Sequence, residues 1–393
     1  MKFAVLGAGN GGQAMAAYLA LKGYRVNLYN RRFSRIEAVK REGGIYLTGV
    51  EKGFARLDLV TTDIGQAIED TEIIMIVTPA VAHKYLASQL APYLQDNQKI
   101  ILNPGRTGGA LEFYHILKQN GCQADILLAE AQTFIFASRV TGPAVAKIYG
   151  IKNYVAVAAF PSNQTRLVVD ELLKVFPQFS PVENIMKTSL DNIGAIFHPA
   201  PTLLNMAWIE STGGSFNYYQ QGISPAISKI MESIDNERMN IARKLGIDPL
   251  SAADWLRLCY GVRGNNLYEL LQNNGQYQGI GAPDHINHRY VLEDVPMSLV
   301  PLASFGEMLN VKTPSINMII DLANLVYDVD FRKTGRTVES LGIDELSVSQ
   351  LTNLVNKGSA DNIKKMPGLR KSFYDKVDNI YYGKFDKYRK EVE

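Results

Sequence analysis

Histidines are the side chains of this chain best suited to proton transfer, because imidazole titrates near neutral pH. Among the five histidines, His198 is the most conspicuous. It interrupts an apolar segment that runs from Ile193 to Pro201, where an imidazole without a partner would be costly to bury. A core histidine with a satisfied hydrogen bond is the commoner reason for such a pattern. His198 is nevertheless the first candidate for general acid–base chemistry.

The remaining histidines make weaker cases. His83 and His115 fall in segments that we predict to be surface helices, and we interpret them as ordinary polar residues. His285 and His288 lie in a polar stretch with Asp284, but two histidines and one carboxylate without a clear third strong ligand make a weak metal site. We therefore expect no bound metal.

A cation and a carboxylate form a second cluster, in which Arg289 precedes Asp294 by five positions. A carboxylate can fix the tautomer of a histidine, and an arginine can hold a substrate carboxylate bidentately. The spacing does not show whether Asp294 meets His198, since nearly a hundred residues separate them. Two solvated charges before a turn are the alternative interpretation.

A glycine-rich turn near the N-terminus indicates a cofactor site. Residues 7–12 read Gly-Ala-Gly-Asn-Gly-Gly, and they follow a predicted strand and open a predicted helix. That context is what an isolated motif of this kind lacks. We predict contacts with the phosphates of a dinucleotide from Gly7, Gly9, Asn10, Gly11 and Gly12. A glycine-rich turn without a ligand is the alternative.

Each glycine has a physical reason at its position. Gly7 permits the tight turn, Gly9 lets the backbone approach a pyrophosphate, and Gly12 lets the helix pack on the strand. The N–H groups and the positive end of the helix that begins near Asn10 then face the phosphates.

The end of the second predicted strand bears on the choice of cofactor. Asn30 stands where an acidic residue would accept hydrogen bonds from a ribose 2′-OH, and Arg31 or Arg32 could pair with a 2′-phosphate. NADP(H) is therefore favoured over NAD(H). The alternative is an NADH enzyme in which Asn30 contacts the ribose and the arginines are solvated. We expect another cofactor contact at Thr78 and Pro79, because ligands bind outside the carboxyl ends of parallel strands.

The elements that must position these residues belong to an α/β fold. Short apolar strands alternate with helix-length segments, which predicts an N-terminal Rossmann-type doubly wound sheet. The predicted strands are Lys2 to Leu6, Arg25 to Tyr29, Leu57 to Thr61, Ile73 to Val77, Lys99 to Leu102 and Ile126 to Ala129. The predicted helices between them are Asn10 to Leu21, Ala80 to Leu90 and Gly108 to Gln119. Two β-rich segments, Val145 to Tyr149 and Tyr154 to Ala159, are expected to extend the same sheet.

From about Asn184 the periodicity is helical, most clearly from Ala226 to Leu245. A chain of 393 residues exceeds what one core usually serves. We therefore predict a dinucleotide-binding domain over residues 1–183 and an all-helical substrate domain over residues 184–393. The stretch from Ser359 to Glu393 is expected to be a surface helix pair or a loose tail.

Composition narrows the classes of partner. Charged residues make up 20% of the chain and nearly cancel to a formal net charge of +2, which argues against nucleic acid and for a small charged metabolite. The longest aliphatic stretch of the first part, residues 73–77, is far short of a membrane span, so no membrane is expected. Two cysteines are too few for a disulfide framework, and the cytoplasm is the expected location. The oligomeric state is open, and a homo-oligomer is compatible with the sequence.

Three segments of the sequence are distinctive together: residues 103–110, residues 197–205, and residues 289–290 with 293–296. On these segments the chain resembles, as far as about Gly342, the opine dehydrogenase family, whose enzymes reductively couple an amino acid to a 2-keto acid. The segment after Gly342 does not match, and we assign it no role.

The resemblance implies roles for five residues. His198 would be the proton donor and acceptor, Asp294 its partner, and Arg289 the group that grips the carboxylate of the amino acid. Thr133 looks like the position that contacts the keto acid, and Ser138 falls where the amino-acid side chain is approached.

The implied reaction is the condensation of the two substrates to an imine, followed by hydride transfer from NAD(P)H. The protein must then orient two carboxylated substrates and manage one proton, while the helical domain closes over them and excludes water. One rival is another small-metabolite reductase, such as a 2-keto acid or sugar-phosphate dehydrogenase with a lysine as general acid. A second rival is a non-catalytic protein that only binds NAD(P)H.

Overall fold

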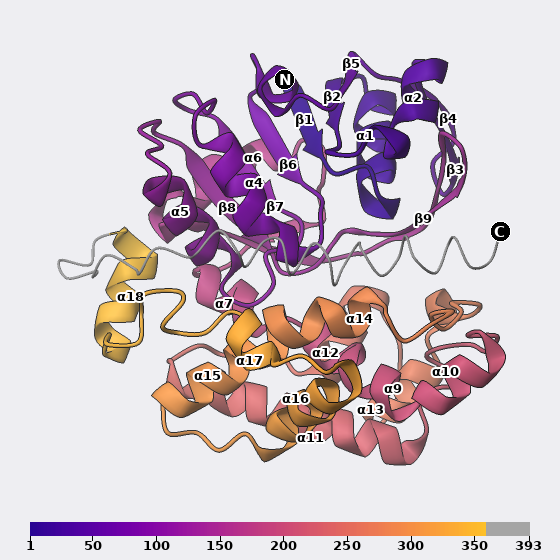
Figure 1. Ribbon diagram of the computed structural model, residues 1–393, viewed down its shortest axis with the longest axis vertical. Coiled ribbons are helices and arrows are strands. Elements are labelled where there is room, and N and C mark those ends of the chain that lie inside the picture. Colours follow the sequence, from indigo (N-terminus) through magenta and orange to yellow (C-terminus); the bar gives the residue numbers. More distant parts are fainter. Residues whose placement is uncertain (359–393) are drawn as a thin grey trace. The chain divides into compact units, whose positions relative to one another are not determined.

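A mostly parallel sheet forms the framework of the first part of the chain in the computed structural model, which describes residues 1–358 (Figure 1). Its strands lie in the order β12 (Phe179–Pro181), β11 (Val155–Phe160), β8 (Leu127–Ala131), β7 (Lys99–Leu102), β6 (Ile73–Ile76), β1 (Lys2–Leu6), β2 (Arg25–Tyr29) and β5 (Leu59–Thr61). Neighbouring strands run parallel except at the β8–β11 pair, which is antiparallel. The prediction of a Rossmann-type sheet is confirmed.

The register of the sheet brings the carboxyl ends of its central strands to one edge. Leu6 pairs with Tyr29 on one side and with Ile76 on the other, and Ile76 pairs in turn with Leu102. The segments that follow these strands therefore share that edge, which is where such sheets bind ligands. They begin at Gly7, Asn30, Val77 and Asn103.

Helices pack against this sheet as the alternating pattern predicts. They are α1 (Asn10–Leu21), α2 (Glu37–Glu42), α3 (Ile64–Ile68), α4 (His83–Leu90), α5 (Gly109–Gln119) and α6 (Thr165–Leu172), with the 3-10 turns η1 (Phe33–Arg35), η2 (Ala80–Ala82) and η3 (Ser162–Gln164). Every residue of β6 is fully buried. A strand buried on both faces explains why its sequence is a continuous apolar run.

A second sheet of four strands lies beside α1, in the order β4 (Gly53–Arg56), β3 (Gly44–Gly49), β10 (Val145–Ile151) and β9 (Phe136–Gly142). The prediction that residues 145–149 extend the first sheet is wrong, whereas residues 154–159 do fall in it, as β11. The burial of the two segments explains the difference. Buried and accessible residues alternate along β10, which has one covered face, while β11 is buried throughout.

Residues 185–358 are mostly helical, which confirms the second half of the predicted fold class. Its helices are α7 (Ile185–Leu190), α8 (Gly194–Phe197), α9 (Pro199–Leu204), α10 (Met206–Thr212), α11 (Pro225–Lys244), α12 (Ala252–Tyr260), α13 (Leu267–Gln272), α14 (Arg289–Leu292), α15 (Val300–Met308), α16 (Pro314–Tyr327), α17 (Phe331–Thr334) and α18 (Val348–Lys357). Two short turns, η4 (Gly275–Tyr277) and the π-helical η5 (Val295–Leu299), complete the described part. The long helix α11 begins after Ser224, whose hydroxyl accepts a hydrogen bond from Ile227 N.

The described residues after Gly342, 343–358, contact the sheet-bearing part through α18. Asn356 Oδ1 accepts hydrogen bonds from Ser162 Oγ at 3.0 Å and from Asn184 Nδ2 at 3.2 Å. The helix thus contacts the chain on either side of β12. The predicted helix pair or tail from Ser359 to Glu393 lies outside the described residues, and the domain boundary near Asn184 stays a prediction.

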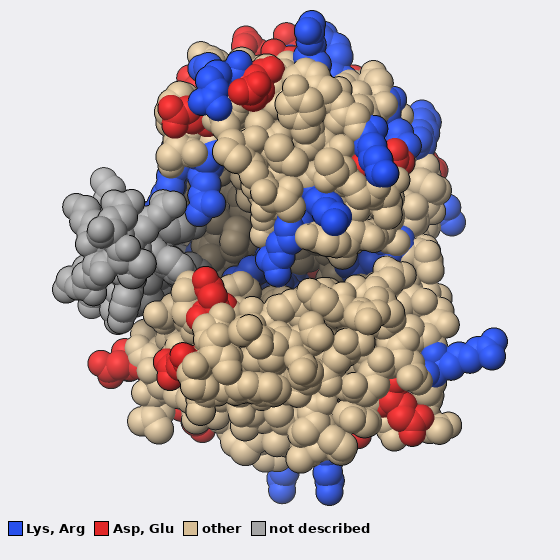
Figure 2. Space-filling model, turned by 90° about the vertical axis from the view of Figure 1, so that its right-hand side faces the viewer, with Lys and Arg blue, Asp and Glu red and all other residues tan. Residues whose placement is uncertain are grey.

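Lys and Arg side chains gather around a hollow between the sheet-bearing part and the helical part (Figure 2). Clefts lined by one sign of charge attract ligands of the opposite sign. The charge around this hollow therefore favours an anionic ligand.

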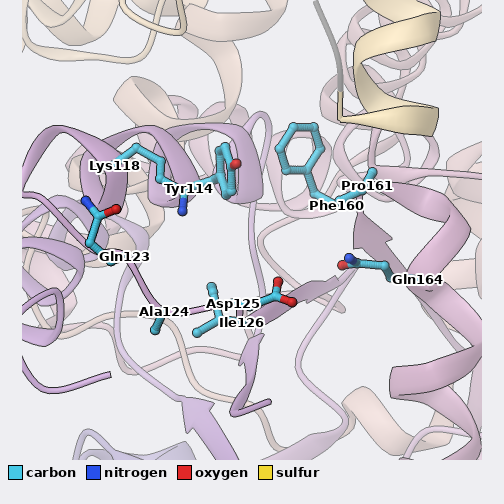
Figure 3. A pocket seen from close by; sticks show the side chains of 9 residues that line it. All are labelled: Tyr114, Lys118, Gln123, Ala124, Asp125, Ile126, Phe160, Pro161 and Gln164. Atoms are coloured by element: carbon cyan, nitrogen blue, oxygen red, sulfur yellow. The ribbon is translucent and has the colours of Figure 1, made fainter. Parts of the chain in front are cut away.

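A shallow pocket lies at the opposite edge of the sheet, where β8 begins and β11 ends (Figure 3). Tyr114, Lys118 and Asp125 are among its lining residues, and Gln164 closes one side. Its position away from the carboxyl ends of the parallel strands separates it from the predicted ligand site. No helix within residues 1–358 is long and apolar enough to span a membrane.

Candidate active site

Two glycines of the 7–12 turn are required by its geometry. Gly7 has a φ of +114°, and a Cβ there would collide with the carbonyl oxygen of Val77. A Cβ on Gly12 would collide with the carbonyl oxygen of Gly7, so the start of α1 sits directly against β1. A Cβ on Gly9 would meet no described heavy atom within 4 Å. The turn is thus closed on its protein side and open at Gly9.

The start of α1 is suited to binding an anion. Helix α1 begins at Asn10, has Gly9 as its N-cap residue and carries no acidic side chain in its first turn. Asn10 also ties the turn to β9, because its Oδ1 accepts from Val140 N at 2.9 Å and its carbonyl accepts from Ser138 Oγ at 3.2 Å. Ser138 therefore contacts the predicted cofactor turn, and its predicted contact with the amino acid stays a prediction. A Cβ on Gly11 would press on the ring of Phe134.

Asn30 holds the backbone of the glycine turn through a hydrogen bond. Its Oδ1 accepts from Ala8 N at 3.2 Å, and its Nδ2 donates to Arg32 O at 3.1 Å. Both ends of the amide are thus engaged within the protein, which weakens the alternative in which Asn30 binds the ribose. The guanidinium of Arg31 lies over the ring of Tyr85, 5.0 Å from its centroid.

The other predicted contacts of the cofactor also lie at this edge. Thr78 Cγ2 approaches Gly7, and Pro79 begins the short turn η2. Thr133 follows β8 and precedes Phe134, whose carbonyl accepts from Lys152 Nζ at 2.6 Å. Burial lowers the pKa of Lys152 to about 8. The structure therefore places Thr133 on a braced segment beside the glycine turn.

His198 and Asp294 are in contact although they are far apart in sequence. His198 Nδ1 lies 2.7 Å from Asp294 Oδ2. Asp294 is fully buried, whereas 17% of the His198 side chain is exposed. The ring of Tyr290 stacks on the imidazole at a centroid distance of 4.0 Å, and Tyr218 Oη donates to the His198 carbonyl at 2.9 Å. The imidazole is thus held at Nδ1 and across one face.

Both pKa values of the pair lie below their ordinary values, for different reasons. Burial lowers the pKa of His198, and the neighbouring Asp294 carboxylate opposes that shift. Burial alone would raise the pKa of Asp294, but Arg106 and His198 hold it at about 2. The pair is therefore a neutral imidazole against a carboxylate in the neutral pH range.

Arg106 is a site residue that the sequence analysis missed. Its Nη1 lies 3.1 Å from Asp294 Oδ1, and its Nε lies 3.3 Å from Glu293 Oε1. It follows β7 in a tight loop and has a positive φ of 63°. Arg336 Nη1 holds that loop by donating to the carbonyls of Gly105 and Thr107 at 3.0 and 3.2 Å. The rule that marked Thr78, a position just beyond a buried strand, could also have marked Arg106.

Arg289 is the first residue of α14, five residues before Asp294. Its Nε lies 2.9 Å from Glu293 Oε2, and 46% of its side chain is exposed. His288 caps the helix, because its Nδ1 accepts from Tyr290 N at 3.4 Å, and burial lowers the pKa of His288 to about 3. Within residues 1–358 no group of three or more His, Cys, Asp or Glu could hold a metal.

The interpretation of His83 as a surface residue is wrong. Its side chain is fully buried, its Nδ1 lies 3.3 Å from Arg336 Nη2, and burial lowers its pKa well below the ordinary value. Arg336 also pairs with Glu112 at 2.8 Å. This contact joins α4 and α5 to a residue beyond α17, and such a long-range contact leaves no local signal in the sequence.

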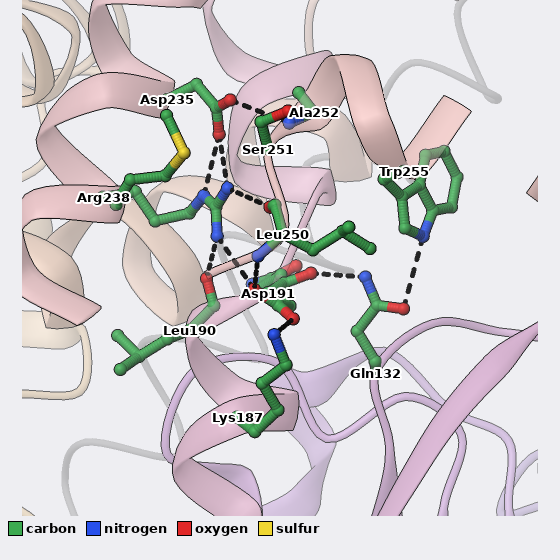
Figure 4. Close-up of polar contacts among 12 residues, drawn as sticks. Gln132, Lys187, Leu190, Asp191, Asp235, Arg238, Leu250, Ser251, Ala252 and Trp255 are labelled. Atoms are coloured by element: carbon green, nitrogen blue, oxygen red, sulfur yellow. Dashed lines mark hydrogen bonds and ion pairs between the residues drawn. The ribbon is translucent and has the colours of Figure 1, made fainter. Parts of the chain in front are cut away.

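A polar network fixes the chain that leads into His198 (Figure 4). The fully buried Arg238 binds Asp235 at 2.6 Å and Asp191 at 3.3 Å, directly after α7. The Asp191 carbonyl accepts from Gln132 Nε2. The other end of the same side chain, Gln132 Oε1, accepts from Trp255 Nε1 at 3.3 Å. The network therefore links the end of β8 to the helices around His198.

Family models match both parts of the chain. A model described as NAD/NADP octopine/nopaline dehydrogenase, alpha-helical domain, matches residues 181–327. A model of ketopantoate reductase PanE/ApbA matches residues 3–103.

Curated proteins match most of its length. An opine dehydrogenase of Arthrobacter sp. strain 1C is 41% identical over 354 residues, which cover 90% of this chain and 98% of that protein. A vitopine synthase of Allorhizobium ampelinum is 24% identical over 369 residues, which cover 90% of this chain and 99% of that protein.

Solved structures share the fold. Octopine dehydrogenase in a complex with NADH and L-arginine matches with a TM-score of 0.73 and 20% identity, over 92% of this chain and 98% of that chain. Yersinopine dehydrogenase with bound NADP+ matches with a TM-score of 0.66 and 17% identity, over 91% of this chain and 97% of that chain.

Proposed function

The chain belongs to the opine dehydrogenase family, and from this premise we propose that it reductively couples an amino acid to a 2-keto acid. Such an enzyme is an NAD(P)-dependent oxidoreductase acting on CH–NH bonds. Membership rests on the 41% identity to the Arthrobacter opine dehydrogenase over 98% of that protein. The observation that carries the proposed chemistry is the 2.7 Å contact between His198 and Asp294, in a site that also holds Arg289.

The glycine turn fits a dinucleotide. Gly7 and Gly12 carry no Cβ, so the backbone of the turn can lie close to the start of α1. Gly9 faces open space, where a ligand can approach. The first-turn N–H groups of α1 would hold the pyrophosphate, and Thr78 and Pro79 would line the nicotinamide side. The bound cofactor supplies the hydride.

His198 moves the proton in this proposal. With Nδ1 bound by Asp294, Nε2 is the atom that gives a proton to the reacting substrates or takes one from them. The imidazole becomes an imidazolium when it takes the proton, and the buried carboxylate of Asp294 stabilises that charge. Because Arg106 keeps Asp294 ionised, this stabilisation is present throughout the neutral range.

Arg289 and Thr133 orient the two substrates. The half-exposed guanidinium of Arg289 binds the carboxylate of the amino acid, and Thr133 contacts the keto acid at the end of β8. Ser138 is proposed to approach the amino-acid side chain. Holding the two reactants in one geometry is the main contribution that the protein makes to the condensation.

We also propose a preference for NADPH, supported by Arg31 and Arg32 at the end of β2 and by the engaged amide of Asn30. Arg31→Ala should raise the dissociation constant of NADPH about tenfold, since a charge-assisted bond to the 2′-phosphate would be lost. The dissociation constant of NADH should change less than twofold. Fluorescence titration with both cofactors measures the difference, and equal effects on the two would remove the preference.

The function itself is tested by NADPH oxidation with a matrix of keto acids and amino acids. The proposal predicts oxidation when a keto acid and an amino acid are present together. Oxidation with one substrate alone indicates a simple keto acid reductase. Cofactor binding without turnover across the matrix indicates a non-catalytic protein.

A further inference from the structure

Glu293 is a buried carboxylate to which the reaction assigns no role. It has no exposed surface, and it contacts groups from three parts of the chain. Its Oε1 accepts from Ala80 N at 3.1 Å and lies 3.3 Å from Arg106 Nε, while its Oε2 lies 2.9 Å from Arg289 Nε. Burying a charge is costly unless it is paired, and here two arginines pair it.

These contacts complete a chain in which carboxylates and guanidinium groups alternate, with an imidazole at one end. It runs from His198 through Asp294, Arg106 and Glu293 to Arg289, with contacts of 2.7, 3.1, 3.3 and 2.9 Å. The group proposed to move the proton stands at one end. The group proposed to bind the substrate carboxylate stands at the other.

The backbone at this point is unusual. Consecutive residues of a regular helix point about 100° apart, because the helix has 3.6 residues per turn. Glu293 and Asp294 nevertheless contact the same guanidinium of Arg106. The two residues lie between the end of α14 at Leu292 and the next turn, residues 295–299, which is π-helical. Interruptions of this kind are frequent at functional sites.

We propose that Glu293 is a positioning residue, which presents the Arg289 guanidinium to the carboxylate of the amino-acid substrate. The proposal rests on the function proposed above. Glu293 engages Arg289 at Nε, across one turn of α14. It is itself anchored to the sheet edge by Ala80 N and Arg106. The position of Arg289 is therefore set from the carboxyl edge of the sheet, where the cofactor is proposed to bind.

Glu293→Gln tests this role, because it keeps the shape of the side chain and removes its charge. The amide oxygen can still accept from Ala80 N, so the dissociation constant of NADPH should stay within twofold of the parent. The neutral amide cannot form the ion pair with the Arg289 guanidinium, so Arg289 loses its anchor. The KM for the amino acid should rise about tenfold, and kcat should change less than threefold.

Two further variants control for simple damage to the fold. Glu237→Gln removes another largely buried glutamate, which accepts from Ser315 N and Ile316 N at the start of α16. It should leave the KM for the amino acid unchanged even where it lowers the melting temperature. Glu293→Asp keeps the negative charge but places it one methylene farther from Arg289. This variant should give an intermediate KM for the amino acid. This variant provides the test if Glu293→Gln does not fold.

The double variant with Arg289→Met separates this proposal from the proposed function. Arg289→Met alone should raise the KM for the amino acid about ten- to a hundredfold. Adding Glu293→Gln should raise it no further, because Glu293 acts through Arg289. If Arg289→Met raises the KM and Glu293→Gln leaves it within twofold, the positioning role is wrong and the function stands. Multiplying effects in the double variant would also overturn the positioning role. An unchanged KM in Arg289→Met would remove the substrate-binding assignment on which it depends.

Discussion

Two buried carboxylates, one at the end of β8 and one after α14, behave in opposite ways. Glu130 is met by neutral donors, namely Thr188 Oγ1 at 2.6 Å, Ser189 Oγ at 2.9 Å and Ala110 N at 2.8 Å. Burial raises its pKa to about 7 despite these hydrogen bonds. Asp294 is equally buried, yet Arg106 and His198 hold its pKa at about 2.

The difference shows what a carboxylate needs in order to serve a proton-transfer pair. Hydrogen bonds from hydroxyl and amide groups do not offset the cost of burying the charge of Glu130, so this group titrates near neutrality. A guanidinium offsets that cost for Asp294, which stays ionised and can stabilise an imidazolium. The sheet side of the site thus carries a structural carboxyl group, and the helical side carries a permanent charge.

Replacing Arg106 should abolish most of the difference in pKa between Glu130 and Asp294. Breaking a buried ion pair from one side costs about 3 to 5 kcal/mol, because the carboxylate is left without its cation. In Arg106→Met the pKa of Asp294 should therefore rise, and the acidic limb of the pH profile of kcat/KM should move to higher pH. Arg106→Lys keeps a positive charge and should give a smaller shift.

The exposed Arg257, which pairs with Asp254 at 2.7 Å, provides a matched control. Arg257→Met should leave the pH profile where it is. A folded Arg106→Met enzyme with an unmoved acidic limb would show that Arg106 does not set the charge of Asp294.

Replacing Glu130 should produce a smaller effect, on the pH dependence of the free energy of unfolding. The pKa of Glu130 in the folded protein, about 7, lies above the ordinary value of 4.5. The folded state therefore holds this proton more tightly than the unfolded state, and stability falls as the pH rises from about 4.5 to about 7. The loss is on the order of 3 kcal/mol or less.

Glu130→Gln should remove this component. Urea denaturation at several pH values should show the parent losing stability relative to the variant across that range, with no further change above it. Glu69→Gln, at an exposed position, is the control and should show no such difference. Parallel curves for the parent and Glu130→Gln would contradict the raised pKa.

The sequence predicts the features of the site that depend on neighbouring residues. The glycine turn, its strand and its helix lie within residues 2–21, so their types and spacing carry the prediction. His198 is conspicuous because it interrupts its own apolar segment. The prediction for residues 145–149 names the wrong sheet, because Lys147 is the only charged residue among them and the alternating burial is not visible in the residue types.

The charge chain could not be predicted in the same way. Arg106 and Glu293 are separated by 187 residues, and Arg336 and Gly105 by 231. Such contacts arise when the helices meet the sheet edge, and they leave no spacing in the sequence. The same holds for the contact between the buried His83 and Arg336, which lie 253 residues apart.

A double-mutant cycle on His198 and Asp294 tests the central claim, that the two residues form one proton-transfer unit. His198→Ala should lower kcat by about 100- to 10,000-fold while NADPH still binds, because the general acid–base group is lost. Asp294→Asn should lower kcat as well, since the imidazolium loses its stabilising charge. The account predicts that the double variant is scarcely slower than His198→Ala alone. Losses that multiply in the double variant would contradict it.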